Sequence, residues 1–186
     1  MPLPHGGEVL VIGCIGAGKT MLMRRLETAS SGHVAKELPA PQPTVGTELL
    51  ELTHRRCVFA LREMGGAMMP LWPRYFAVCR SLIFVADTSS DTAVAAAVLE
   101  WHNALGDKAL FGKPVLLVLN HRDRDTALPE EEVRQLFRLA DLEATGRTFT
   151  VCWTSAARGT GVDAVLEWCA EAALFAAAGS PASVAV

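Results

Sequence analysis

The sequence lacks a long apolar run and a large excess of charge of either sign. Its 17 basic and 20 acidic residues leave a net charge of -3, which excludes binding of nucleic acid or a membrane surface through bulk positive charge. The longest apolar runs, residues 81–86 and 115–119, have the length of strands, whereas a transmembrane helix needs roughly 18 apolar residues. We therefore expect a protein that neither crosses a membrane nor binds nucleic acid.

The cysteines and the N-terminal residues give no sign of a secreted protein. The five cysteines are an odd number without a close pair, and four of them lie in apolar runs typical of a core, so neither disulfides nor a zinc site is expected. Residues 1–7 have neither the basic flank nor the apolar segment of a signal peptide. We expect a cytoplasmic location.

The length and composition predict one folded domain. The chain has 186 residues, of which 51% are hydrophobic and 20% are charged, as in a globular domain with a large buried sheet. We expect a short N-terminal tail at residues 1–7, a domain at residues 8–178 and a flexible tail of small residues at 179–186.

Short apolar runs alternate with helical patterns along the chain, which predicts an α/β fold. The expected strands are residues 8–12, 48–54, 57–63, 82–85, 115–119 and 149–153, and the expected helices are residues 18–29, 92–105, 129–140 and 162–178. A short turn joins the second and third strands, so they should form an antiparallel hairpin. The prediction is a six-stranded, mostly parallel sheet with one antiparallel edge strand and helices on both faces.

A phosphate-binding motif follows the first strand. The run Gly13-Cys14-Ile15-Gly16-Ala17-Gly18-Lys19-Thr20 matches G-x-x-x-x-G-K-[ST] between a strand and a helix. Backbone N–H groups of this loop are expected to face phosphate oxygens, with Lys19 reaching the β- and γ-phosphates and Thr20 ligating Mg²⁺. The motif predicts the P-loop NTPase fold.

A second motif identifies the base. Asn120-His121-Arg122-Asp123 ends the fifth strand and resembles the guanine-reading pattern N-K-x-D, with His121 in place of Lys. An aspartate can accept hydrogen bonds from the ring N–H and the amine of guanine, a pair that adenine lacks, so discrimination can reach roughly 10⁴-fold. Ser155 and Ala156, after the last strand, resemble an element whose backbone N–H meets the guanine oxygen.

Two further segments are placed to sense a γ-phosphate. Thr44 follows a long loop rich in Ser, Gly and Pro, and its hydroxyl can bind Mg²⁺ when a triphosphate is present. Glu63-Met64-Gly65-Gly66 resembles D-x-G-G, with Glu63 on the magnesium side and the Gly66 N–H directed at the γ-phosphate.

These motifs together resemble the small GTPases of the Ras superfamily, and particularly their Arf-like branch. The resemblance spans about residues 9–168 and includes Gly65-Gly66, then Pro70-Leu71-Trp72 with Tyr75-Phe76, and Leu82-Ile83-Phe84-Val85 with Asp87. It implies GTP or GDP with Mg²⁺ as ligands, and protein effectors, an exchange factor and a GTPase-activating protein as partners. It also implies a role in membrane traffic or at the cilium, with location at the Golgi or cilium reached through partners.

The sequence departs from the Arf pattern at several positions. Arfs place a water-orienting glutamine after the two glycines, whereas this chain has Ala67 and a loop two residues shorter. We therefore expect very slow intrinsic hydrolysis, and His121 predicts weaker packing over the base. Pro2 replaces the glycine that Arfs use for myristoylation, and no C-terminal cysteine is present for prenylation, so no direct lipid anchor is expected.

The segment after the two glycines is unusually apolar and is expected to contact effectors. The residues assigned to this surface are Met68, Met69, Trp72 and Tyr75, although Trp72 and Phe76 suit the core equally well.

The sequence leaves three functions open. The favoured function is a monomeric guanine-nucleotide switch that recruits effectors. A pseudo-GTPase scaffold would bind partners independently of nucleotide turnover, as Ala67, Glu63 and His121 suggest. A nucleotide kinase would need arginines near the phosphates, whereas Arg122 and Arg124 lie near the expected base site instead.

Overall fold

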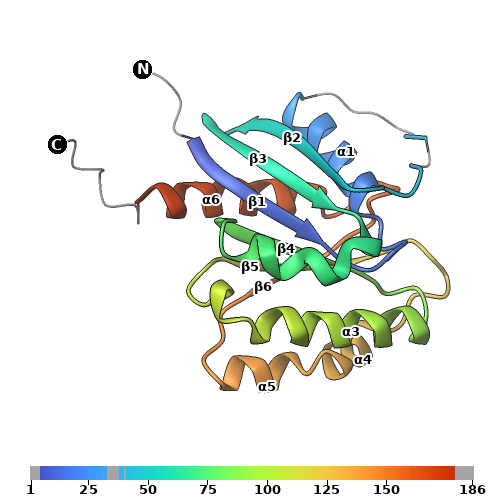
Figure 1. Ribbon diagram of the computed structural model, residues 1–186. Helices are drawn as coiled ribbons and strands as arrows, with labels where there is room; N and C mark the ends of the chain where they lie inside the picture. The colour runs from blue at the N-terminus through green and yellow to red at the C-terminus, as the bar shows by residue number, and fades with distance from the viewer. Residues whose placement is uncertain (1–4, 33–37, 40, 179–186) are drawn as a thin grey trace.

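The fifth residue of the chain already belongs to the central sheet. The structure is a computed structural model that describes residues 5–32, 38–39 and 41–178. Its strands are β1 (His5–Ile12), β2 (Thr47–His54), β3 (Cys57–Met64), β4 (Ser81–Asp87), β5 (Val115–Asn120) and β6 (Thr150–Trp153). They form one sheet in the order β2-β3-β1-β4-β5-β6, parallel except for the antiparallel β2–β3 pair at one edge (Figure 1). The predicted α/β class and sheet are confirmed.

Helices cover both faces of this sheet. They are α1 (Lys19–Ser30), α2 (Trp72–Phe76), α3 (Asp91–Gly106), α4 (Glu130–Leu136), α5 (Leu139–Ala144) and α6 (Val162–Ala178), with short 3₁₀ helices η1 (Gly66–Leu71) and η2 (Lys108–Leu110). Helices α1 and α6 pack on one face and α2 to α5 on the other. Within the described residues, no helix is both long enough and apolar enough to cross a bilayer.

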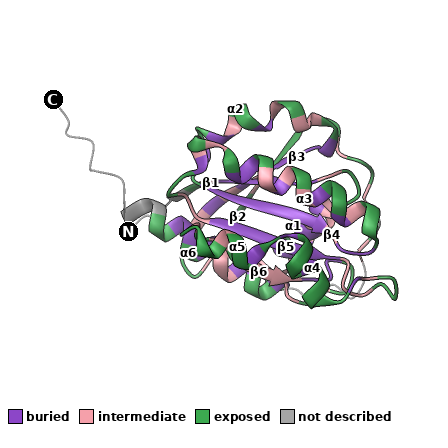
Figure 2. Cartoon of the chain, turned by 90° about the horizontal axis from the view of Figure 1, so that it is seen from below, coloured by how far each residue is buried: buried purple, intermediate pink, exposed green. Residues whose placement is uncertain are grey.

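Strand β4 shows how the sheet divides the interior into two cores. Leu82 and Phe84 belong to the cluster under α3, whereas Ile83 and Val85 belong to the cluster under α1 and α6. This division follows because successive side chains of a strand point to opposite faces, and a parallel strand covered on both faces is apolar throughout. Figure 2 shows the buried strands between helices whose outer surfaces are exposed.

Two predicted elements differ from the structure by more than two residues. Strand β1 begins at His5, inside the predicted tail. Its pairing with β3 is irregular between His5 and Glu8, where Gly7 has a φ of +81°. An irregular stretch of this kind has no apolar pattern by which a strand could be recognised from sequence. The predicted single helix 129–140 is two helices in the structure, α4 and α5. Arg138 adopts a left-handed φ of 52° between α4 and α5, which buries both Phe137 and Leu139. Residues 1–4 and the predicted tail 179–186 lie outside the described residues.

The hairpin between β2 and β3 is confirmed. His54 pairs with Cys57, and the two intervening residues, Arg55 (φ 48°) and Arg56 (φ 63°), both have left-handed backbones. This conformation is typical of a two-residue type I′ turn. The hairpin brings the loop that contains Thr44 beside the end of β3.

The segment from η1 to α2 is fixed at its C-terminal end by Lys113. The Lys113 ammonium donates to the carbonyl oxygens of Phe76 (2.6 Å), Ala77 (3.1 Å) and Cys79 (2.7 Å). The positive charge also suits the carbonyl end of a helix. Sequence patterns gave no prediction for η1 or α2, which are short helices that contain prolines.

Candidate functional site

The loop between β1 and α1 is built around its lysine. Lys19 is 5% exposed, and its Nζ donates to the carbonyl oxygens of Gly13 (2.9 Å) and Cys14 (3.1 Å). Burial lowers the pKa of Lys19, an effect that attraction to Glu63 partly offsets. A Cβ at Gly13 would lie 2.1 Å from the Val85 carbonyl oxygen, so only glycine fits where the loop crosses β4.

Three side chains from separate elements meet beside this lysine. The Thr20 hydroxyl donates to Glu63 Oε1 at 2.8 Å, the Thr44 hydroxyl reaches the same oxygen at 3.1 Å, and the two hydroxyl oxygens are 2.9 Å apart. Glu63 is 1% exposed, and burial raises its pKa. Its Oε2 has no hydrogen-bond partner among the described residues. An unpaired buried carboxylate oxygen beside two hydroxyls fits a hard divalent cation such as Mg²⁺.

The two glycines after β3 press closely on neighbouring backbone. The Gly65 N–H donates to the Gly46 carbonyl oxygen at 3.0 Å, and a Cβ at Gly66 would lie 2.5 Å from the backbone nitrogen of Ile15. Ala67 is exposed beyond them. The segments that carry Thr44 and Gly66 therefore adjoin the phosphate loop, as the motifs predict.

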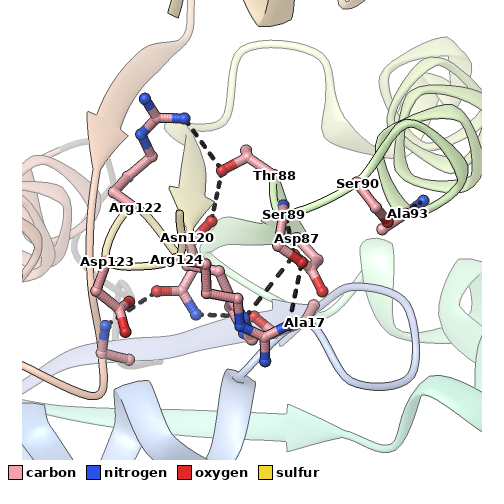
Figure 3. A network of polar contacts seen from close by, with 12 residues as sticks. Ala17, Asp87, Thr88, Ser89, Ser90, Ala93, Asn120, Arg122, Asp123 and Arg124 are labelled. Carbon is pink, nitrogen blue, oxygen red and sulfur yellow. Dashed lines mark hydrogen bonds and ion pairs between the residues drawn. The ribbon is translucent and has the colours of Figure 1, made fainter. Parts of the chain in front are cut away.

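Asn120 is the centre of the other end of the site (Figure 3). Its side chain is 1% exposed, and its Nδ2 donates to the Ala17 carbonyl oxygen at 2.9 Å. Its Oδ1 accepts from the Thr154 hydroxyl at 3.1 Å and from the Ala156 N–H at 3.0 Å. One amide thus links the phosphate loop, β5 and the loop after β6.

Asp123 is held as a carboxylate at this end. The Ser155 hydroxyl donates to Asp123 Oδ1 at 2.6 Å. Burial alone would raise the pKa of Asp123, but this hydrogen bond, a backbone hydrogen bond and the charge of Arg158 bring the pKa below its usual value. The side chain can therefore accept hydrogen bonds from a base with two adjacent donors.

His121 lies between the two ends of the site. It has a left-handed φ of 68°, and a Cβ on Gly18 would lie 3.0 Å from its Nε2. Its Nδ1 is 3.8 Å from Asp87 Oδ1. Burial lowers the pKa of His121, with Asp87 opposing the effect, so the ring is neutral at pH 7 and packs over the loop as an uncharged surface.

A single cavity of about 510 Å³ joins both ends. Of the residues predicted to bind phosphate, base or metal, the following line it: Gly16, Gly18, Lys19, Thr20, Thr44, Glu63, Gly66, Asn120, His121, Asp123 and Ala156. Gly13, Ala17 and Ser155 do not line it. They support it through the hydrogen bonds to Lys19, Asn120 and Asp123 described above.

The predicted effector residues do not form one exposed surface. Trp72 is 2% exposed and meets Phe84 edge to face, with ring centroids 6.3 Å apart, so its assignment to a surface is wrong. The apolar ring gains more from the core than from solvent. Met68, Met69 and Tyr75 are half-buried and pack against the same core, with part of each side chain accessible.

Sequence patterns missed several supporting residues. Thr88 donates to the Asn120 carbonyl oxygen at 2.7 Å, and Arg124 lines the cavity while its Nη1 donates to Ser89 Oγ at 3.1 Å. Arg122 lies 5.0 Å above the Trp153 ring and donates to the Leu128 carbonyl oxygen at 2.6 Å. Arg25 of α1 contacts the loop after β6. Only the position of the two arginines beside the base motif could have drawn attention to them.

The neighbourhood of Arg62 accounts for one departure from the Arf pattern, which has tryptophan there. Its guanidinium forms two hydrogen bonds to the Glu8 carboxylate, at 2.7 and 2.8 Å, between β3 and β1. Arg62, and Met64-Gly65-Gly66 followed by a shortened loop, make the chain resemble the divergent ADP-ribosylation factor-like protein 16, and comparison confirms the likeness. The human protein of that name is 37% identical over 166 residues, which cover 87% of this chain and 84% of the relative.

Other known proteins show the same relationship. Drosophila melanogaster ADP-ribosylation factor-like protein 1 is 28% identical over 163 residues, covering 87% of this chain and 86% of the relative. The structure of the Arl6 BBS3 small GTPase from Trypanosoma brucei, with the nucleotide analogue GppNp bound, superposes with a TM-score of 0.74 at 24% identity. The match covers 90% of this chain and 97% of that one, and it shows the shared fold. A model of the ADP-ribosylation factor family matches residues 5–173, and the chain therefore belongs to that family of small GTPases.

Proposed function

We propose that the protein is a guanine-nucleotide-dependent switch that binds GTP or GDP with Mg²⁺. The observation that carries the proposal is the Asp123 carboxylate, which lines the base end of the cavity and is oriented by Ser155. In an adenine complex this carboxylate would have no pair of donors to accept from, and an unpaired charged acceptor is costly. Base selectivity is thus built into the site.

The residues of the phosphate end have separate roles. Lys19 neutralises phosphate charge, and the loop N–H groups orient the phosphate oxygens. Thr20, Thr44 and Glu63 would hold Mg²⁺, which supplies positive charge that stabilises a triphosphate. The Thr44 and Gly66 segments would change position with the third phosphate, and this change would alter the accessible parts of Met68, Met69 and Tyr75 for an effector.

We further propose that intrinsic GTP hydrolysis is very slow. Ala67 carries no group that can orient a water molecule, and Ile15 (70% exposed) and Val45 (98% exposed) add apolar surface to the same end of the cavity. A GTPase-activating partner could supply an orienting group or an arginine, an effect of roughly 10³ to 10⁵ in rate. Such a partner, an exchange factor and effectors complete the proposed cycle of a monomer in the cytoplasm, which reaches Golgi or cilium membranes through partners.

Calorimetric titration of nucleotide-free protein with GTP, GDP and ATP, with and without Mg²⁺, tests the proposal. We expect binding of both guanine nucleotides and at least about a thousandfold weaker binding of ATP. Asp123→Ala should abolish this preference, whereas Asp125→Ala, at an exposed site outside the cavity, should keep it. Equal affinity for GTP and ATP in the wild type would contradict the proposal.

The pseudo-GTPase scaffold is the second candidate, and Ala67 with its apolar surroundings is the observation that favours it. A switch binds its partner more tightly in one nucleotide state, whereas a scaffold binds equally in both. Partner affinity should therefore be compared between the GDP-loaded and GTP-loaded protein. Met68→Ser with Met69→Ser should weaken that binding if the accessible parts of these side chains contact the partner, provided that the melting temperature shows a folded variant.

A further inference from the structure

A buried arginine of α1 holds the loop that follows β6. Arg25 is 6% exposed. Its Nε donates to the Ala156 carbonyl oxygen at 2.9 Å, and its Nη2 donates to the Ala157 carbonyl oxygen. A guanidinium stays charged at any pH near neutral, and its burial is costly unless its N–H groups are hydrogen-bonded. The fold therefore keeps a charged guanidinium hydrogen-bonded to two carbonyl oxygens of this loop.

The same loop is bonded from its other side by β5 and the base motif. The Ala156 N–H donates to Asn120 Oδ1 at 3.0 Å, and the Ser155 hydroxyl donates to Asp123 Oδ1 at 2.6 Å. Ala156 and Ala157 line the cavity. The loop is thus fixed between the base motif and α1, the helix that begins at the phosphate loop.

The planar peptide bond links the hydrogen bonds of Arg25 to the orientation of N–H groups in the loop. The carbonyl of Ala156 and the N–H of Ala157 belong to one planar trans peptide and point in opposite directions. Since Arg25 binds that carbonyl, the Ala157 N–H is turned away from α1. The next peptide works in the same way, because Arg25 binds the Ala157 carbonyl while the Arg158 N–H donates to Ser155 Oγ at 3.1 Å. This is the hydroxyl that orients Asp123.

We infer that Arg25 is a positioning residue for base recognition. By fixing two successive peptide planes, it directs the Ala157 N–H at the exocyclic oxygen of guanine and keeps Ser155 in place to orient Asp123. Arg25 does not line the cavity and acts only through the loop. The inference rests on the proposed guanine-binding function.

The test compares Arg25→Met with Arg25→Lys and with the matched control Arg24→Met. Arg24 is the neighbouring arginine of α1, and its Nη1 donates to the Pro39 carbonyl oxygen at 3.4 Å, an exposed contact away from the base. The ligands are GDP and the diphosphate of 2-aminopurine riboside, which keeps the phosphates and the amine but lacks the exocyclic oxygen and the ring N–H. Binding of ADP to the wild type serves as the reference for base selectivity.

Arg25→Met should weaken GDP binding about tenfold and binding of the 2-aminopurine analogue by clearly less, because this ligand can lose only the contact of its amine with Asp123. Arg25→Lys, which keeps the charge and can reach one carbonyl, should be intermediate, and Arg24→Met should match the wild type. Equal weakening of both ligands would show a merely structural role and overturn the inference. A wild type that does not prefer GDP over ADP would refute the proposed function itself, and the inference with it.

Hydrogen exchange in the nucleotide-free protein gives a second readout. Amides of residues 155–158 should exchange at least about tenfold faster in Arg25→Met than in Arg24→Met, while β4 exchanges equally in both. If Arg25→Met does not fold, Arg25→Lys carries the same comparison. Unchanged exchange in this loop would overturn the inference.

Discussion

The two ends of the cavity differ in how their side chains are held. At the base end, the side chains of Asn120 and Asp123 are hydrogen-bonded to two other segments, the phosphate loop and the loop after β6. At the end where a γ-phosphate would lie, the accessible side chains include the apolar Ile15, Val45 and Ala67. Between the two ends, Glu63 Oε1 is hydrogen-bonded to two hydroxyl groups, whereas Glu63 Oε2 has no hydrogen-bond partner among the described residues.

This difference separates binding from turnover. A preorganised base end gives affinity and selectivity without any chemical step. Hydrolysis depends on groups that orient water at the other end, where alanine replaces the group that the Arf pattern provides. The proposed function therefore combines retention of a guanine nucleotide with slow hydrolysis of GTP.

The strongest test of the base end is Asp123→Asn. The amide can donate to a base carbonyl but no longer accepts from two donors, so we expect affinity for GTP to fall by at least about a hundredfold while affinity for xanthosine triphosphate rises. Competition titrations measure both changes. Asp125→Asn is the matched control, and a variant that retains its preference for GTP would show that Asp123 does not read the base.

Asn120→Ala should produce the next largest effect, on the free energy of unfolding. The substitution leaves the Ala17 carbonyl, the Thr154 hydroxyl and the Ala156 N–H without their partner inside the protein. We expect a loss of about 2–4 kcal/mol, measured by urea unfolding without nucleotide. Asn103→Ala, at an exposed position of α3, should change stability by less than about 0.5 kcal/mol. An equal loss of stability in Asn120→Ala and Asn103→Ala would show that the hydrogen bonds of Asn120 do not stabilise the base end.

Ala67→Gln directly tests the end of the cavity where a γ-phosphate would lie. A glutamine amide at this exposed position can orient a water molecule, so the single-turnover rate of GTP hydrolysis should rise about tenfold, limited by the shortened loop. Ala77→Gln, in the exposed segment after α2, is the control. A wild-type rate equal to that of ordinary Arf proteins would already contradict slow turnover.

The smallest expected effect is a pH dependence from His121. Burial lowers the pKa of its ring below the ordinary value of 6.5, and Arg124 acts in the same direction while Asp87 and Asp123 oppose it. Below pH 6.5 the unfolded chain therefore binds more protons at this residue than the folded chain, and stability falls as the pH falls. His121→Asn should remove this part of the decline, and the difference between the two urea-unfolding profiles isolates it. Identical profiles below pH 6.5 would refute it.

The elements that position the site were predictable because each combines a strong apolar period with a motif. The strand before Gly13 and the strand before Asn120 are continuous apolar runs, which periodicity detects well. The break at Arg138 was not predictable, because it depends on burying Phe137 and Leu139 rather than on a local signal. The core position of Trp72 depends on tertiary packing in the same way.

Arg25 could not be found from sequence for a different reason. Its partners are backbone carbonyls of Ala156 and Ala157, and any residue supplies a carbonyl. No side-chain pattern marks such a contact. The motif residues were recognisable because their chemistry lies in the side chains or in an obligatory glycine, whereas the residues that support them act through the backbone.

The three hydrogen bonds from Lys113 anchor the C-terminal end of the segment after β3. Any displacement that follows nucleotide exchange would then be largest at Gly66 and would decrease along the chain toward Phe76, where Lys113 holds the backbone. A probe attached near Gly66 would travel furthest, and one attached at Ala77 would barely move. In the proposed switch, Lys113 would therefore determine which part of this segment moves with the bound nucleotide.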